Sequence, residues 1–190
     1  MEMFIRAVGL YLEFLKNSIK YRKIIRFRGF AVLHAFPGSS IDFDKEGGII
    51  VNSHPLSNLM GLTQRTIFVA RYGGQIHIGH HCGISGSTIY AMDRIEIGNH
   101  VLIGGNCKII DNDFHPIEAS KRINQKPDDI KRAPIVIGDG CFIGANSIIL
   151  KGTTLGKNCV VGAGSVVHGS FPDNVIIAGN PAKIIKENNQ

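Results

Sequence analysis

The sequence of 190 residues contains no tryptophan and only four cysteines, with no CxxC pair among them. Without such pairs a disulfide framework is unnecessary, and we expect free thiols. No secretory signal peptide stands at the start of the sequence, so we expect a cytoplasmic protein. No linker or low-complexity segment divides the chain, which indicates a single domain.

Aromatic residues make up 7% of the chain, and no stacking platform or recognition motif accompanies its positive charge. We therefore expect no nucleic-acid partner. Most of the formal net charge of +6 comes from residues 1–30, whose apolar residues approximate helical spacing. This pattern predicts a basic amphipathic helix, which either caps the core or contacts an anionic membrane surface through residues 1–28.

Aliphatic residues recur at every sixth position in the second half of the chain. They are Ile137, Ile143, Ile149, Leu155, Val161 and Val167. Six residues advance an α-helix by about 600°, which would scatter these side chains over three faces. A strand has a period of two and keeps them on one side, so the repeat predicts a parallel β-solenoid of hexapeptide type.

The same spacing occurs upstream of this block. It places Ile78 and Ile84 in one run and Ile97, Ile103 and Ile109 in another. The 28 residues from Ile109 to Ile137 are not a multiple of six. We therefore expect residues 110–134 to form a loop extruded from the stack.

The ends of a solenoid need covers, because each coil contacts mainly its neighbours. We assign this role to an N-terminal helical cap at residues 1–30 and a C-terminal cap at residues 171–190, within a β-helix domain of residues 31–190. The pattern in residues 41–77 is weaker, and we expect irregular first coils there.

The four cysteines occupy one slot of the repeat, four residues after an aliphatic position. They are Cys82, Cys107, Cys141 and Cys159. The same slot elsewhere holds serine, threonine or valine, so we expect a small, half-buried site in which the thiol only packs.

The extruded loop begins with the polar run from Asp111 to His115. Histidine can accept a proton near neutral pH, and a carboxylate bonded to its other nitrogen would fix its tautomer. His115 with Asp111 or Asp113 is therefore a candidate catalytic group. A histidine that caps a strand end by hydrogen bonding would leave the same pattern.

The hexad blocks, the Asp111-Asn112-Asp113-Phe114-His115-Pro116 segment and the ending Ala178-Gly179-Asn180-Pro181-Ala182-Lys183 together resemble the hexapeptide-repeat O-acetyltransferases. The maltose, galactoside and capsular or exopolysaccharide enzymes are the most similar group. The resemblance implies an all-β, left-handed parallel β-helix and a homotrimer. It also implies acetyl-coenzyme A as co-substrate in a groove between subunits, without a metal, and transfer of acetyl to a sugar or saccharide hydroxyl in polysaccharide biosynthesis.

The resemblance also implies roles for individual residues. His115 matches the histidine that takes a proton from the acceptor hydroxyl as the oxygen attacks the thioester, and Asp113 or Asp111 would orient it. Small residues matching Ala145 and Ala163 meet the pantetheine arm, although turn geometry alone would explain them equally well.

Three further residues belong to the implied cofactor site. Basic residues matching Lys183 and Lys186 lie near the nucleotide phosphates. Phe142 stands where the family commonly has tryptophan and would wall the site. His168-Gly169 replaces a Thr-Lys pair, so we assign no contact there.

Ser85 and Asn112 are our candidate acceptor-binding residues. Hydrogen bonds to a polyol are also open to Asn52, Asn58, Arg65 and Ser87, each of which has an ordinary turn role as an alternative. The basic N-terminal segment favours a lipid-linked saccharide at the inner face of the membrane.

Two other functions stay open at this point. The repeat alone implies no catalysis, so the solenoid could be a non-catalytic scaffold. A γ-type carbonic anhydrase would need three histidines on a shared zinc ion, for which His80, His81, His100 and His115 supply candidates. Their spacing does not resemble that enzyme's motif.

Overall fold

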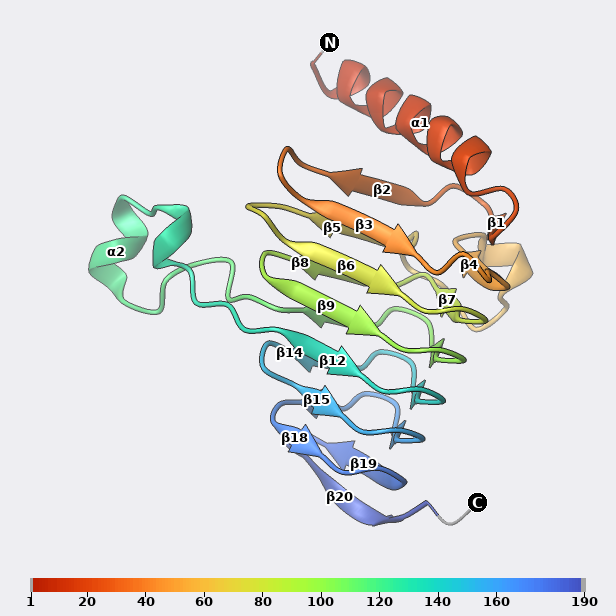
Figure 1. The fold of residues 1–190 in the computed structure, drawn as a ribbon. Coiled ribbons are helices and arrows are strands. Elements are labelled where there is room, and N and C mark those ends of the chain that lie inside the picture. The colour runs from red at the N-terminus through yellow and green to blue at the C-terminus, as the bar shows by residue number, and fades with distance from the viewer. Residues whose placement is uncertain (1, 189–190) are drawn as a thin grey trace.

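The computed structural model describes residues 2–188, with the side chains of residues 2–6 left aside, and consists of three parallel β-sheets stacked in successive coils (Figure 1). Sheet A contains β1 (Ile25–Arg28), β4 (Ile49–Asn52), β7 (Gly83–Ser85), β10 (Leu102–Ile103), β13 (Phe142–Ile143), β16 (Val160–Val161), β19 (Val175–Gly179) and β20 (Ala182–Glu187). Sheet B contains β2 (Val32–Ala35), β5 (Ile67–Ala70), β8 (Thr88–Ala91), β11 (Lys108–Ile110), β14 (Ile148–Leu150) and β17 (Val166–Val167). Sheet C contains β3 (Ser40–Phe43), β6 (Gln75–Ile78), β9 (Arg94–Ile97), β12 (Ile135–Ile137), β15 (Thr154–Leu155) and β18 (Ser170–Phe171).

Each coil contributes one strand to each sheet, in the order A, B, C, and three corners join the sheets. We call them the AB, BC and CA corners, after the sheets that they connect. Every strand pairing is parallel except that of β19 with β20. The predicted all-β architecture of parallel strands is thus confirmed.

The six-residue repeat corresponds to one inward side chain per short strand. Ile137 pairs with Leu155 and Ile143 with Val161, eighteen residues on in both cases, so three hexads make one coil. All six aliphatics of the later block are almost completely buried. They form one apolar column along the stack, and burial of this column is the main favourable contribution to folding.

The cysteines are free, but they are fully buried and not half-buried as expected. Their slot lies at the corners and faces the column, where Cys82 Sγ donates to Gly98 O at 3.1 Å and Cys141 Sγ to Gly156 O at 3.0 Å. Burial raises the pKa of Cys82 to about 11 and that of Cys141 to about 12. These are packing residues and not nucleophiles.

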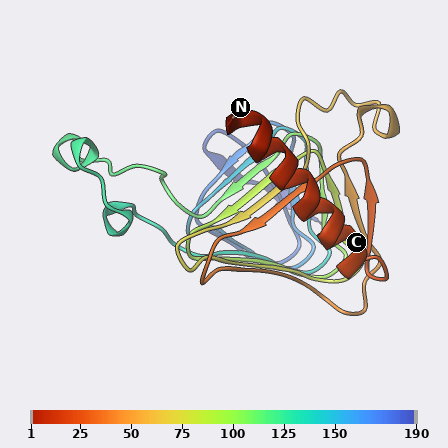
Figure 2. The same cartoon turned by 90° about the horizontal axis from the view of Figure 1, so that it is seen from above.

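The helix α1 (Glu2–Lys20) lies across the open end of the first coil (Figure 2). Its Phe14 packs edge-on against Phe27 and Phe30. The stack begins at β1, inside the segment assigned to the cap, because Ile25 continues the inward column that Ile49 occupies one coil later. At the other end, β20 folds back along β19.

The first coils are more regular than expected. Strands β3 to β6 are four residues long, and β5 and β6 each bury two side chains. The repeat of one buried aliphatic residue in every six is therefore hard to recognise in this part of the sequence. The irregularity is confined to residues 53–66 at the AB corner, with the 3₁₀ helix η1 (Pro55–Ser57). Between residues 2 and 188 no helix combines the length and apolarity that crossing a bilayer requires.

Candidate active site

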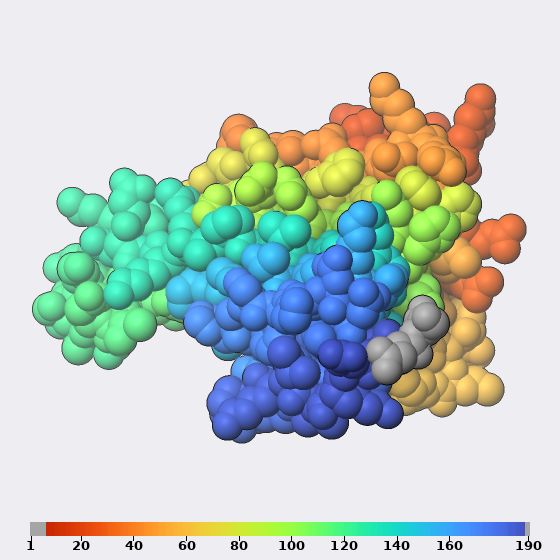
Figure 3. Space-filling model, turned by 60° about the horizontal axis from the view of Figure 1, so that its bottom comes forward, coloured from red at the N-terminus to blue at the C-terminus, as the bar shows by residue number. Residues whose placement is uncertain are grey.

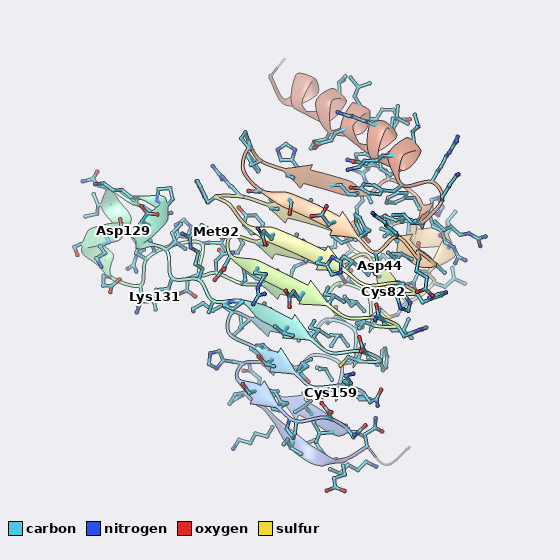
Figure 4. All side chains as sticks on the ribbon, in the orientation of Figure 1. Asp44, Cys82, Met92, Asp129, Lys131 and Cys159 are labelled. Carbon is cyan, nitrogen blue, oxygen red and sulfur yellow. The ribbon has the colours of Figure 1, made fainter. Side chains whose placement is uncertain are left out.

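Residues 111–134 leave the stack at the BC corner and contain α2 (Ala119–Ile123) and η2 (Pro127–Asp129). Figures 1 and 3 show this segment standing away from the sheets. Its two ends are joined at a neck by backbone hydrogen bonds, from Asp113 N to Lys131 O at 3.1 Å and from Ala133 N to Asp111 O at 3.0 Å. In Figure 4, Met92 lies at this neck, whereas Asp129 and Lys131 lie on the loop.

Asp111 anchors the neck to the stack. Its two carboxylate oxygens accept hydrogen bonds from Met92 N and Asp93 N, both at 2.8 Å, and the side chain is completely buried. Burial raises the pKa of this carboxyl group, against the lowering effect of those hydrogen bonds. Asp111 is therefore a structural group of the described chain and does not contact His115.

Asn112 shapes the turn that presents the histidine. Its Oδ1 accepts from Phe114 N at 2.9 Å, and its Nδ2 donates to Asp111 Oδ1 at 3.1 Å. This turn holds Phe114 at a φ of 59°, in the left-handed region, with its ring 4.8 Å from that of Tyr90. Both polar ends of the Asn112 side chain thus make hydrogen bonds within the protein.

His115 is exposed on the loop and has one side-chain partner within the part of the chain that the structure describes. Its Nδ1 lies 2.7 Å from Gln125 Oε1, and Gln125 Nε2 donates to Phe114 O at 3.1 Å. Because the amide nitrogen of Gln125 is used by the carbonyl, its oxygen faces the imidazole. Nδ1 then carries the proton, and Nε2 is left as a free acceptor, the state that a general base requires.

Among the residues that the structure describes, the side chain bonded to His115 is that of Gln125, and neither Asp111 nor Asp113 has that contact. Asp113 instead accepts a hydrogen bond from Lys151 on the next coil, and its Oδ2 is buried without a partner among the described residues. Gln125 was missed because no spacing rule links it to His115. The turn through α2 brings the two residues together.

The proposed cofactor residues lie elsewhere in the chain. Ala145 and Ala163 occupy the AB corner in consecutive coils, and the side chain of Phe142 is 46% exposed on the outer face of sheet A. Lys183 and Lys186 are exposed on β20, at the end of the same sheet. The chain gathers these five residues along one side of the stack.

His115 is on the opposite side of sheet B from this group, at the BC corner. A single chain therefore does not bring the histidine and the cofactor residues together. Ser85 ends β7 near the AB corner and also lies away from His115.

Several other polar candidates serve the local turns. Asn52 Oδ1 accepts from His54 N and Ser57 Oγ, and Asn58 Oδ1 accepts from Met60 N. Ser87 is buried, and its Oγ lies 2.9 Å from each of two backbone oxygens, those of Ser85 and Gly104. Arg65 lies over the ring of Phe30.

Comparison with known proteins gives the repeat a family. The family model described as "Hexapeptide repeat of succinyl-transferase" matches residues 134–168. Galactoside O-acetyltransferase of Escherichia coli K12 is 36% identical over 119 residues, which cover 62% of this chain and 57% of that protein. The putative lipopolysaccharide biosynthesis O-acetyl transferase WbbJ of the same organism is 39% identical over 106 residues, or 53% of this chain and 54% of WbbJ.

The chain is therefore similar to hexapeptide-repeat acetyltransferases. A crystal structure of a maltose O-acetyltransferase from Clostridium difficile 630 has a TM-score of 0.52 and 26% identity, over 94% of this chain and 78% of that one. The chain spans about half the length of the curated relatives that it matches. These similarities agree with the resemblance that the His115 segment and the chain's ending indicate.

Proposed function

We propose that the chain is an O-acetyltransferase that moves an acetyl group from acetyl-coenzyme A to a hydroxyl of a sugar or saccharide. The observation that carries the proposal is the His115–Gln125 hydrogen bond, which leaves Nε2 of an exposed imidazole as an acceptor. The names of the galactoside, maltose and lipopolysaccharide relatives support a carbohydrate acceptor.

In the proposed reaction His115 is the general base. Its Nε2 takes the hydroxyl proton while the acceptor oxygen attacks the thioester carbonyl. A C–O bond forms, the C–S bond breaks, and the proton passes from the imidazolium to the leaving thiolate. Gln125 Oε1 accepts a hydrogen bond from Nδ1–H throughout and so keeps the tautomer and the ring orientation fixed.

The site is completed by a second subunit of a left-handed, trimeric assembly. This proposal is supported by the separation of His115 from the cofactor residues, which lie at different corners of one chain. It is also supported by an apolar row on the outer face of sheet A, formed in register by Ile50, Leu102, Phe142, Val160 and Ile176. The matching row of sheet C is polar where it carries Asp42, His77 and Glu96. Apolar outer faces favour packing against another chain, whereas the polar one suits solvent.

The acceptor is proposed to be lipid-linked, with the enzyme at an anionic membrane surface. The outward face of α1 supports this proposal, because it exposes Val8, Leu12, Leu15 and Ile19 at helical spacing while Phe14 packs on the first coil. Basic residues flank the stripe, including Lys16, Lys20 and Lys23. An apolar stripe with basic flanks is typical of helices that lie in the interface of anionic bilayers.

The test is an assay of the purified chain with acetyl-coenzyme A, a panel of sugars and glycolipids, and detection of the released thiol. We expect at least one saccharide to be acetylated. His115→Ala should lower turnover by roughly 10² to 10⁴ while coenzyme A affinity stays nearly unchanged. Full turnover in this variant would exclude His115 as the base, and a protein that binds no coenzyme A would be a scaffold.

A further inference from the structure

Three histidines meet at the CA corner, far from the loop that carries His115. His80 and His81 lie in the turn after β6, and His100 lies in the corresponding turn after β9. Each offers a ring nitrogen, and these nitrogens all lie within 4.8 Å of one another. In Figure 4 this corner is marked by Cys82, on the side of the stack away from the loop.

The rings are held close by the geometry of the two turns. His81 and His100 have φ values of 55° and 57°, and their rings stack with an interplanar angle of 6° and a centroid distance of 5.0 Å. The ring of His80 stands edge-on to both, with centroids 5.1 and 5.0 Å away.

The turn itself does not require histidine. In later coils the same left-handed position of the CA corner holds Gly140, Asn158 and Asn174, with φ values of 68°, 54° and 56°. Glycine and asparagine are the residues that adopt this conformation most readily. Two histidines at successive copies of this position therefore need an explanation other than backbone geometry.

The polar contacts of the cluster provide that explanation. His80 Nδ1 lies 2.8 Å from His81 Nδ1, and His80 Nε2 lies 3.5 Å from Glu46 Oε2 in the turn before β4. Two nitrogens bound to one tetrahedral zinc ion are about 3.3 Å apart, given Zn–N bonds of about 2.0 Å. Small side-chain adjustments would bring the imidazoles to this separation.

We propose that His80, His81 and His100, with Glu46 beside them, form a binding site for a divalent transition-metal ion of the zinc type. Imidazole nitrogens are ligands that such ions prefer. Glu46 lies on the far nitrogen of His80, where a carboxylate would orient the ring without binding the ion. The ion would connect the turns of two successive coils, after β6 and β9, and so stabilise the upper part of the stack. Within one chain the cluster lies at a different corner from His115.

The proposal is tested on the full chain, after treatment with EDTA, by calorimetric titration with Zn²⁺ and by thermal unfolding. We expect one ion per chain and a higher unfolding temperature with Zn²⁺. The variants His81→Asn and His100→Asn, singly and together, preserve the turn because asparagine already serves there in later coils. The double variant should bind Zn²⁺ at least tenfold more weakly and lose the thermal shift.

His168→Asn is the matched control, since His168 is exposed on a different corner. It should bind Zn²⁺ as the unaltered chain does. Absence of Zn²⁺ binding to the unaltered chain, or equal binding by the folded double variant, would overturn the proposal. Acetyl transfer is not the readout, so the metal site and the proposed enzyme activity can fail independently.

Discussion

At the residue scale, the proposed base depends on one amide. Gln125 holds His115 Nδ1 through Oε1, and the hydrogen bond from its Nε2 to Phe114 O fixes which end of the amide faces the ring. A carboxylate at position 125 could still accept a hydrogen bond from Nδ1–H, whereas alanine could not. Position 125 is therefore a positioning site whose effect should appear in turnover and not in coenzyme A binding.

We predict that Gln125→Ala lowers kcat by roughly 10-fold to 100-fold, with little change in coenzyme A affinity, and that Gln125→Glu recovers most of the loss. Steady-state kinetics on an accepted saccharide measure both effects. Gln75→Ala, at an exposed position on sheet C, is the control and should leave kcat and coenzyme A affinity unchanged. Equal losses of kcat in the alanine and glutamate variants would argue that a hydrogen bond from Nδ1–H to residue 125 does not orient His115.

The buried thiols permit a prediction about pH. Burial raises the pKa of Cys82 to about 11 and that of Cys141 to about 12, so both are neutral at pH 8. Alkylation by iodoacetamide at pH 8 should therefore proceed only through unfolding, as mass spectrometry of native and denatured samples would reveal. An unfolded thiol ionises near pH 8.5, so the free energy of unfolding should fall as the pH rises from about 8.5 towards 11. Rapid labelling of the native chain would contradict the burial.

At the scale of single elements, the hexads predicted the coils because each short strand buries one aliphatic side chain. The six-residue spacing continues without interruption from Ile137 to Val167. The start of the stack was not predictable in the same way. Ile25 belongs to the core column, but it stands in a basic segment whose charge pattern indicates a surface helix. The His115–Gln125 pair depends on how the chain turns through α2, which no repeat encodes.

The helix α1 is the element on which the membrane proposal rests. Leu12 and Ile19 are exposed on its outer face, so their replacement should change binding to membranes without disturbing the cap. We predict that the intact chain binds vesicles of phosphatidylglycerol and phosphatidylcholine at low salt, more weakly at high salt, and that Leu12→Gln with Ile19→Gln reduces binding at least tenfold.

Vesicle sedimentation measures this effect. Ile184→Gln is the control, because Ile184 is an exposed apolar residue on β20, at the far end of the stack. No binding by the intact chain at low salt would end the membrane hypothesis and leave α1 as a cap. Equal losses in the α1 variant and the control would point to a general effect of surface apolarity.

At the scale of the whole molecule, the triangular stack separates functions by corner. The BC corner carries His115, the AB corner and sheet A carry the proposed cofactor residues, and the CA corner carries the histidine cluster. Figure 2 shows the segments at residues 53–66 and 111–134 projecting from two different corners. A reaction that needs His115 and Lys183 together therefore needs two chains.

This division of the site can be tested by complementation between subunits. His115→Ala and Lys183→Glu should each be poorly active alone, the first for lack of the base and the second because a carboxylate repels the nucleotide phosphates. When equal amounts are refolded together, each site draws its histidine and its lysine from different chains, each intact with a probability of about one half. About a quarter of the wild-type activity should then return. If mixed trimers form, as native mass spectrometry would detect, and no activity returns, both residues serve from one chain and the groove between subunits is not the site.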